Sequence, residues 1–108
     1  MTHKTASEWL GNQGLSHTEI DFIETILTYT STAKMLGNKL TEINQTVHKS
    51  FPDKKVEIDP NLTFMQFESL LRKNGIFIDV NDLLNRYKTQ GLCSELCNQL
   101  LYNQLKKQ

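Results

Sequence analysis

Apolar residues recur at helical spacing over the first half of the chain, in two successive stripes. The first stripe consists of Ile20, Ile23, Ile26 and Leu27. The second falls at positions 33, 36, 40, 43 and 47, at alternating intervals of three and four residues. Such spacing places side chains on one face of an α-helix. The pattern therefore predicts a long helical region over residues 17–50.

The step from the first stripe to the second raises the question of whether this helix is continuous. Joining Leu27 to Ala33 through Thr30 rotates the stripe by roughly 100° on an ideal helix. The helix either runs on and contacts different neighbours along its length, or breaks in the stretch TYTSTA. Thr and Ser lower helix propensity there without forbidding a helix. We expect one uninterrupted helix.

A helix-turn-helix is the alternative for the same residues. It would place a turn at 41–43 between helices at 33–40 and 44–51. The turn glycine, the apolar position after it and the last core position are occupied by Thr41, Glu42 and Ser50. The motif therefore fails at informative positions where the second stripe does not.

Capping residues mark the starts of further helices. Thr5, Ser16 and Thr63 are each followed three residues later by Glu or Gln, which is the pattern of a capping box, and Asp79 is a fourth N-cap candidate. With glycine and proline stops, these predict helices near residues 6–11, 63–74, 80–88 and 92–106. Residues 51–62 hold both prolines and are expected to form a loop, and residues 76–78 an extended connector without a partner strand.

These elements predict an all-α fold. We expect a single α-helical domain over residues 1–108, built as a small helical bundle of four to five helices on one long helix at about 17–50. A chain of 108 residues with 38% hydrophobic residues is long enough for one modest core.

Charge changes the picture little. The formal net charge is zero, with one Lys against four acids in residues 1–30 and five Lys against two acids in residues 31–55. This middle segment is only mildly basic, so nucleic acid is not the expected partner. We expect neither a signal peptide nor a membrane-spanning segment, and hence a cytoplasmic protein. A composition rich in Lys, Asn and Ile is typical of the AT-rich genomes of many bacteria and phages.

Few residues suggest chemistry. Cys93 and Cys97 lie four apart on the predicted last helix, a spacing that is poor for a disulfide and leaves a zinc site without two of its ligands. We expect both to pack in the core, with a metal or redox role as the alternative. The histidines form no pair and no phosphate-binding glycine motif occurs. We therefore expect no enzyme, no cofactor, no metal and no small-molecule substrate.

The length of the predicted helix carries the functional prediction. Thirty helical residues span about 45 Å, whereas a domain of this size has a radius of gyration of about 13 Å. One end should therefore project or be covered by another chain. This predicts a protein-binding module, such as an adaptor, inhibitor or secretion-type chaperone, that associates with another protein or with itself.

The predicted partner surface is the first apolar stripe. We expect the face with Ile20, Ile23 and Leu27 to be incompletely buried, with Trp9 either added to it or anchoring the first helix. Acidic residues beside it would favour a basic partner: Glu19, Asp21 and Glu24. On this hypothesis Ile23→Asp leaves the monomer folded and abolishes association.

The alternative function is a DNA-binding regulator that uses the helix-turn-helix at about 33–51. Asn44, Gln45 and His48 would face bases, and Lys49 would contact phosphates together with Lys54 and Lys55.

Overall fold

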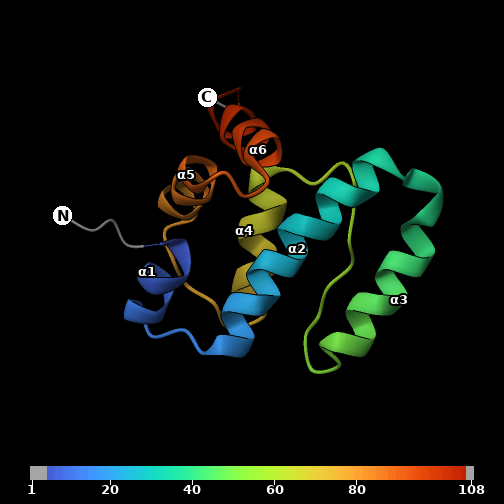
Figure 1. Cartoon of the computed structure of the whole chain (residues 1–108), viewed down its shortest axis with the longest axis horizontal. Coiled ribbons are helices and arrows are strands. Elements are labelled where there is room, and N and C mark those ends of the chain that lie inside the picture. The colour runs from blue at the N-terminus through green and yellow to red at the C-terminus, as the bar shows by residue number, and fades with distance from the viewer. Residues whose placement is uncertain (1–4, 107–108) are drawn as a thin grey trace.

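Hydroxyl side chains begin three of the helices, as the sequence predicts. The computed structural model describes residues 5–106 (Figure 1). Thr5, Ser16 and Thr63 each accept a hydrogen bond from the backbone N–H three residues on, and the Glu or Gln at that position bonds back to the cap. Asp79 caps a fourth helix by accepting from the N–H of Asp82. These caps satisfy N–H groups that lack a partner within the helix.

Residues 5–106 form six α-helices and no β-strand. They are α1 (Ala6–Asn12), α2 (His17–Met35), α3 (Leu40–Ser50), α4 (Phe64–Lys73), α5 (Val80–Gln90) and α6 (Ser94–Lys106), with a 3-10 turn, η1 (Gly37–Lys39). The all-α prediction is confirmed, with six helices where four to five were expected. The single-domain prediction also covers residues 1–4 and 107–108, which lie outside the described residues.

The predicted uninterrupted helix over residues 17–50 is wrong. α2 ends at Met35, and Leu36 has a backbone outside the helical region, with φ −126° and ψ 63°. The break falls neither in TYTSTA nor at 41–43, so the predicted helix-turn-helix boundaries are wrong as well. After η1 the chain turns back, and α3 packs beside α2 (Figure 1).

The break brings both helices into one core. Ala33 at the end of α2 and Val47 on α3 are both buried in that core. On a straight helix Val47 would lie about 21 Å further along the axis than Ala33, whereas the turn after Met35 places α3 beside α2. Leu36, a member of the predicted second stripe, is instead exposed at the corner.

None of the helices in residues 5–106 is as long as the predicted one. The 19 residues of α2 span about 28 Å, which is less than the 43 Å longest dimension of the protein. The geometric reason for expecting an uncovered helix end is therefore removed. Among residues 5–106, no helix combines the length and apolar character that crossing a bilayer requires.

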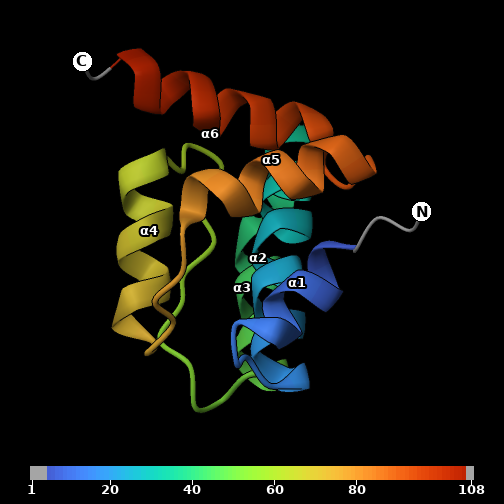
Figure 2. The same cartoon turned by 90° about the vertical axis from the view of Figure 1, so that its left-hand side faces the viewer.

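The helices pack in two directions. α5 and α6 lie side by side, α6 also contacts α4, and α1 packs against α2 and α5 (Figure 2). Gly91 ends α5 in the left-handed region with φ 88°, and the N–H of Leu92 bonds back to the C=O of Tyr87 at 3.0 Å. Glycine adopts this conformation without steric cost, so the chain can reverse sharply into α6.

The predicted loop at 51–62 is confirmed, and part of it is extended. It runs between α3 and α4, opposite in direction to both (Figure 2). Within it, Val56 and Ile58 are buried, whereas Lys55, Glu57 and Asp59 are exposed. This alternation has the period of two that is typical of extended backbone. We refer to residues 55–59 as the bridging segment.

Candidate functional site

The residues predicted to bind a partner lie on the α1–α2 side of the molecule. Trp9 and Ile20 are half-buried, but Ile23 and Leu27 are fully buried, each with 0% of its surface exposed. The predicted exposure of those two side chains is wrong. Both side chains belong to the common hydrophobic core, on a helix that packs against α1 and α3. In the folded chain Ile23 and Leu27 cannot contact a partner.

A buried hydroxyl network reinforces this side. The hydroxyls of Ser7 on α1 and Tyr87 on α5 both donate to Oε2 of Glu24 on α2, each at 2.9 Å. Burial of Tyr87 raises the pKa of its hydroxyl well above the ordinary value of 10.0, and the hydrogen bond to the Glu24 carboxylate raises it further. The network joins three helices through one carboxylate. Glu24, expected on a charged rim, is thus committed internally.

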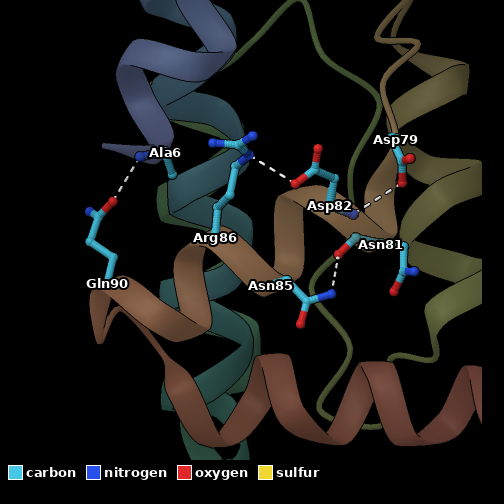
Figure 3. Close-up of polar contacts among 7 residues, drawn as sticks. All are labelled: Ala6, Asp79, Asn81, Asp82, Asn85, Arg86 and Gln90. Atoms are coloured by element: carbon cyan, nitrogen blue, oxygen red, sulfur yellow. Dashed lines mark hydrogen bonds and ion pairs between the residues drawn. The ribbon is translucent and has the colours of Figure 1, made fainter. Parts of the chain in front are cut away.

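The polar groups on the outer face of α5 are also used within the protein (Figure 3). Gln90 accepts a hydrogen bond from the N–H of Ala6 at 2.8 Å, which ties the end of α5 to the start of α1. Arg86 donates to Asp82 at 2.8 Å, and its guanidinium carbon lies 4.5 Å from the ring centroid of Trp9. This contact holds Trp9 against α5, the arrangement expected of an anchor for the first helix.

The residues of the alternative DNA-binding hypothesis lie together on α3, with Gln45, His48 and Lys49 exposed. Asn44, however, is half-buried and directed at the bridging segment rather than outward. Lys54 lies over the ring of Phe22, 5.6 Å from its centroid. The helix boundaries required for this reading are not those observed.

Asn44 and His48 bind the main chain of the bridging segment. The side-chain amide of Asn44 accepts from the N–H of Ile58 at 2.6 Å and donates to the C=O of the same residue at 3.3 Å. His48 Nε2 lies 2.8 Å from the C=O of Val56, and since a carbonyl only accepts, this nitrogen carries the proton. α3 thus pairs with the segment through side chains, in the way a neighbouring strand would through its backbone.

Asn74, just after α4, makes the matching contact from the opposite side. Its amide accepts from the N–H of Lys55 at 2.7 Å and donates to the C=O of Lys55 at 2.9 Å. The same Nδ2 also donates to the C=O of Leu70, at 2.9 Å. The bridging segment is therefore fixed at two points by asparagine amides from two helices.

The pairing does not use every main-chain group of the bridging segment. In extended backbone, the N–H and C=O of successive residues point to opposite sides, and those of alternate residues point to the same side. Ile58 and the C=O of Val56 bond towards α3, and Lys55 bonds towards the α4 side, so the N–H and C=O of Glu57 also point towards α4. Within residues 5–106 neither group of Glu57 has a hydrogen-bond partner.

Glu57 faces an open groove. This groove, of about 880 Å³, lies between the bridging segment and one face of α4. Its α4 wall is formed by Met65, Gln66, Ser69, Leu70 and Lys73, and Leu40 and Leu62 complete the lining. Met65 is 56% exposed, although it is a large apolar side chain. We refer to this feature as the α4 groove.

The cysteines occupy a different part of the molecule. Cys97 is fully buried and Cys93 half-buried, and Cys93 precedes α6 with φ 51°, rather than lying on the helix as expected. Burial raises the pKa of the Cys97 thiol to about 12. Within the described part of the chain, no three His, Cys, Asp or Glu side chains are grouped to hold a metal ion.

The α4 groove was not predicted from the sequence, because a loop was expected over residues 51–62, with no extended backbone within it. The polar-apolar alternation of Lys55 to Asp59, KVEID, was a detectable signal of extended backbone. Nothing in the sequence indicated that Asn44 and Asn74 would bind that backbone.

No family model, curated protein or solved structure matches this chain. What the groove can bind therefore follows from its own residues.

Proposed function

We propose that this protein is a non-enzymatic protein-binding module that holds an extended segment of a partner in the α4 groove. The observation that carries the proposal is that the N–H and C=O of Glu57 have no partner among the described residues. Both groups point into a groove whose lining includes apolar side chains. A partner segment would pair with Glu57 through its main chain and lay alternate side chains against α4.

Main-chain pairing suits this site because the required edge is already present. A peptide that adds to an exposed edge gains affinity from backbone hydrogen bonds and specificity from pockets for alternate side chains. Glu57 offers one donor and one acceptor on the same side. Neither has to be released from an internal bond before a partner binds.

The apolar lining supplies the second requirement. Met65 and Leu70 lie on the α4 wall, and Leu62 lies where the chain enters α4. Methionine is flexible and polarisable, so it adapts to partner side chains of different shape. Burying an exposed apolar surface of this kind contributes roughly 25 cal/mol per Å².

The asparagine contacts supply rigidity. Ordering a flexible loop on binding costs free energy, and a site that is held in place beforehand avoids this cost. Asn44, His48 and Asn74 hold the bridging segment from outside the groove, on the main-chain groups of Lys55, Val56 and Ile58. Among the described residues, the N–H and C=O of Glu57 are unbonded and so are left for the partner.

This proposal keeps the expected class of function and moves the surface. An adaptor, an inhibitor and a chaperone could each hold an extended segment, and all three stay within the proposal. The partner surface is no longer the face of α2, since Ile23 and Leu27 are buried. No cofactor and no catalytic step form part of it.

Proline at position 57 tests the proposal directly. Peptides that bind the immobilised protein are selected from a random-sequence display library, and their affinities for the wild type, Glu57→Pro and Glu57→Ala are measured by fluorescence anisotropy. Proline removes the N–H that the partner uses, whereas alanine removes only the side chain. Because this N–H has no internal partner, Glu57→Pro should fold normally, as thermal unfolding will check.

We expect Glu57→Pro to weaken binding at least about tenfold, because one main-chain hydrogen bond to the partner is lost. Glu57→Ala should stay within a few fold of the wild type. Selected peptides that bind Glu57→Pro as tightly as Glu57→Ala would overturn the proposal, as would bound peptides that are helical by NMR.

A further inference from the structure

Two lysines line one end of the α4 groove. Lys55 lies on the bridging segment, and Lys73 ends α4. Asn74 follows Lys73 directly and bonds both main-chain groups of Lys55, which brings the two walls together at this end. Neither lysine forms an ion pair with any residue that the structure describes.

The rest of the bridging segment is acidic. Glu57 lies at its centre and Asp59 at its far end, and neither forms an ion pair within residues 5–106. One oxygen of Asp59 accepts from the N–H of Asn61 at 2.8 Å. The segment runs opposite to α4, so Asp59 lies towards the α4 start and Lys55 towards its end (Figure 2). The groove is thus basic at one end and acidic along the remainder.

We propose that the partner segment is an extended peptide of alternating apolar and charged residues, with its charges ordered against those of the groove. This inference rests on the proposed function. An acidic residue lies beside Lys55 and Lys73, and basic residues lie beside Glu57 and Asp59. Opposite charges on directly opposed strand positions attract, and like charges there repel.

Strand geometry fixes the order of the charges. Residues directly opposite each other share a face, so the charged partner residues lie on the exposed face with Glu57 and Asp59. Asn74 already occupies the main-chain groups of Lys55, so the acidic residue reaches Lys55 and Lys73 with its side chain alone. The residues between them turn inward, on the face of Val56 and Ile58 and towards Leu70. Antiparallel pairing is the more stable arrangement. Read from its amino end, the partner then has the order basic, apolar, basic, apolar, acidic.

Short synthetic peptides test this order. A nine-residue peptide with the central sequence Lys-Val-Lys-Val-Glu is compared with the charge-reversed Glu-Val-Glu-Val-Lys and the order-reversed Glu-Val-Lys-Val-Lys, all with identical polar flanks and blocked ends. Fluorescence anisotropy at low salt should show the first binding about tenfold or more tightly than the second, because the charge changes sign at all three charged positions of the peptide. The preference should shrink in high salt, which screens exposed charges.

Two further variants place the contacts. In the double variant Lys55→Glu with Lys73→Glu, the affinity for a peptide whose last central residue is Glu should fall, and that for a peptide ending in Lys should rise. Replacing the amide of the middle Lys of the matched peptide with an ester removes the donor to Glu57 and should weaken binding. The same change at the following Val, whose N–H points away from Glu57, should not.

The outcomes separate the two proposals. Equal binding of all three peptides that is lost in Glu57→Pro overturns the charge order and leaves the proposed function standing. Tighter binding of the order-reversed peptide overturns the antiparallel arrangement. No binding of the matched peptide by a protein that binds display-selected peptides overturns the charge order. A dimer in sedimentation equilibrium that Glu57→Pro dissociates would make a second copy the occupant and overturn the partner peptide.

Discussion

The α1–α2–α5 side and the α3–α4 side of this molecule are held together by different kinds of contact. On the first side, helix packs directly on helix, and fully buried side chains such as Ile23 and Tyr87 fill the space between them. On the second side, an extended segment runs between α3 and α4 and is held through its backbone by Asn44, His48 and Asn74. The first kind of contact is made by side chains and the second by main chain.

This difference decides which side can take a partner. A helix satisfies its own main chain, so its contact surface is closed once the apolar face is covered. An extended segment has main-chain groups on two sides and needs a neighbour on each. Here α3 bonds Ile58 and the C=O of Val56 on one side, and Asn74 bonds only Lys55 on the other, which leaves Glu57 open. The predictions below break or sharpen this contrast.

A charge placed in the core of the α1–α2–α5 side should have the largest effect on stability. Ile23 is fully buried, so Ile23→Asp places a carboxylate without a partner in the apolar core. We expect a loss of at least about 4 kcal/mol in the free energy of unfolding, which is enough to unfold many small domains. Urea denaturation followed by circular dichroism measures it. Ile20→Asp, at a half-buried position on the same helix, should cost clearly less; similar small costs for both would mean that this side is not closed.

Loosening the segment should have the next largest effect. Asn44→Ala removes both bonds to Ile58, leaving a main-chain group without its protein partner, and should cost about 2 kcal/mol. Hydrogen exchange should speed up in residues 55–59 before the helices open. Gln45→Ala, on the exposed face of the same helix, is the control and should change little. Unchanged exchange in Asn44→Ala would show that packing of Val56 and Ile58 alone fixes the segment.

The hydroxyl network should contribute less. Tyr87→Phe removes one of two donors to Glu24 and should cost about 1 kcal/mol. Tyr29→Phe, at a half-buried hydroxyl with no partner among the described residues, should be nearly neutral. Equal costs for the two substitutions would indicate that the network adds no stability.

The same network predicts a dependence on pH. Burial holds the pKa of Tyr87 above its ordinary value of 10.0, so the folded protein keeps this proton longer than the unfolded chain does. The stability that this contributes is complete below about pH 10 and is lost as the pH rises towards the raised pKa. Urea titrations above pH 10 should show a shallower decline in Tyr87→Phe than in the wild type.

Most of the helix starts could be predicted because capping is local chemistry. Each N-cap bonds the residue three positions away, so a window of four residues contains the whole interaction. The four caps are Thr5, Ser16, Thr63 and Asp79. The fold class followed from the same signals and from the helical stripes. Long-range information was not needed for either.

The break at Leu36 and the groove could not be read in the same way. Leu36 is an ordinary helix former, and it leaves the helix because two stripes must reach one core. The groove depends on Asn44 meeting Ile58 and on Asn74 meeting Lys55, which are 14 and 19 residues apart in sequence. An asparagine on a helix gives no sign of which backbone it will bind. The α2 face was wrongly predicted to be open, because local spacing does not show that Ile23 and Leu27 are buried in the common core.

The smallest expected effect on stability concerns a buried hydroxyl of α2 that has no hydrogen-bond partner among the described residues. Thr30 on α2 is buried, with 1% of its surface exposed, and its Oγ1 has no hydrogen-bond partner in the described structure. Valine has nearly the same shape without the hydroxyl, so Thr30→Val should stabilise the protein by up to about 1 kcal/mol. The matched control is Thr32→Val, which removes a hydroxyl that donates to the C=O of Thr28 at 3.0 Å and should bring no gain. Thermal unfolding of both variants measures the difference. A loss of stability in Thr30→Val would show that the Thr30 hydroxyl forms a hydrogen bond in solution, and that this bond contributes to the stability of the α1–α2–α5 side.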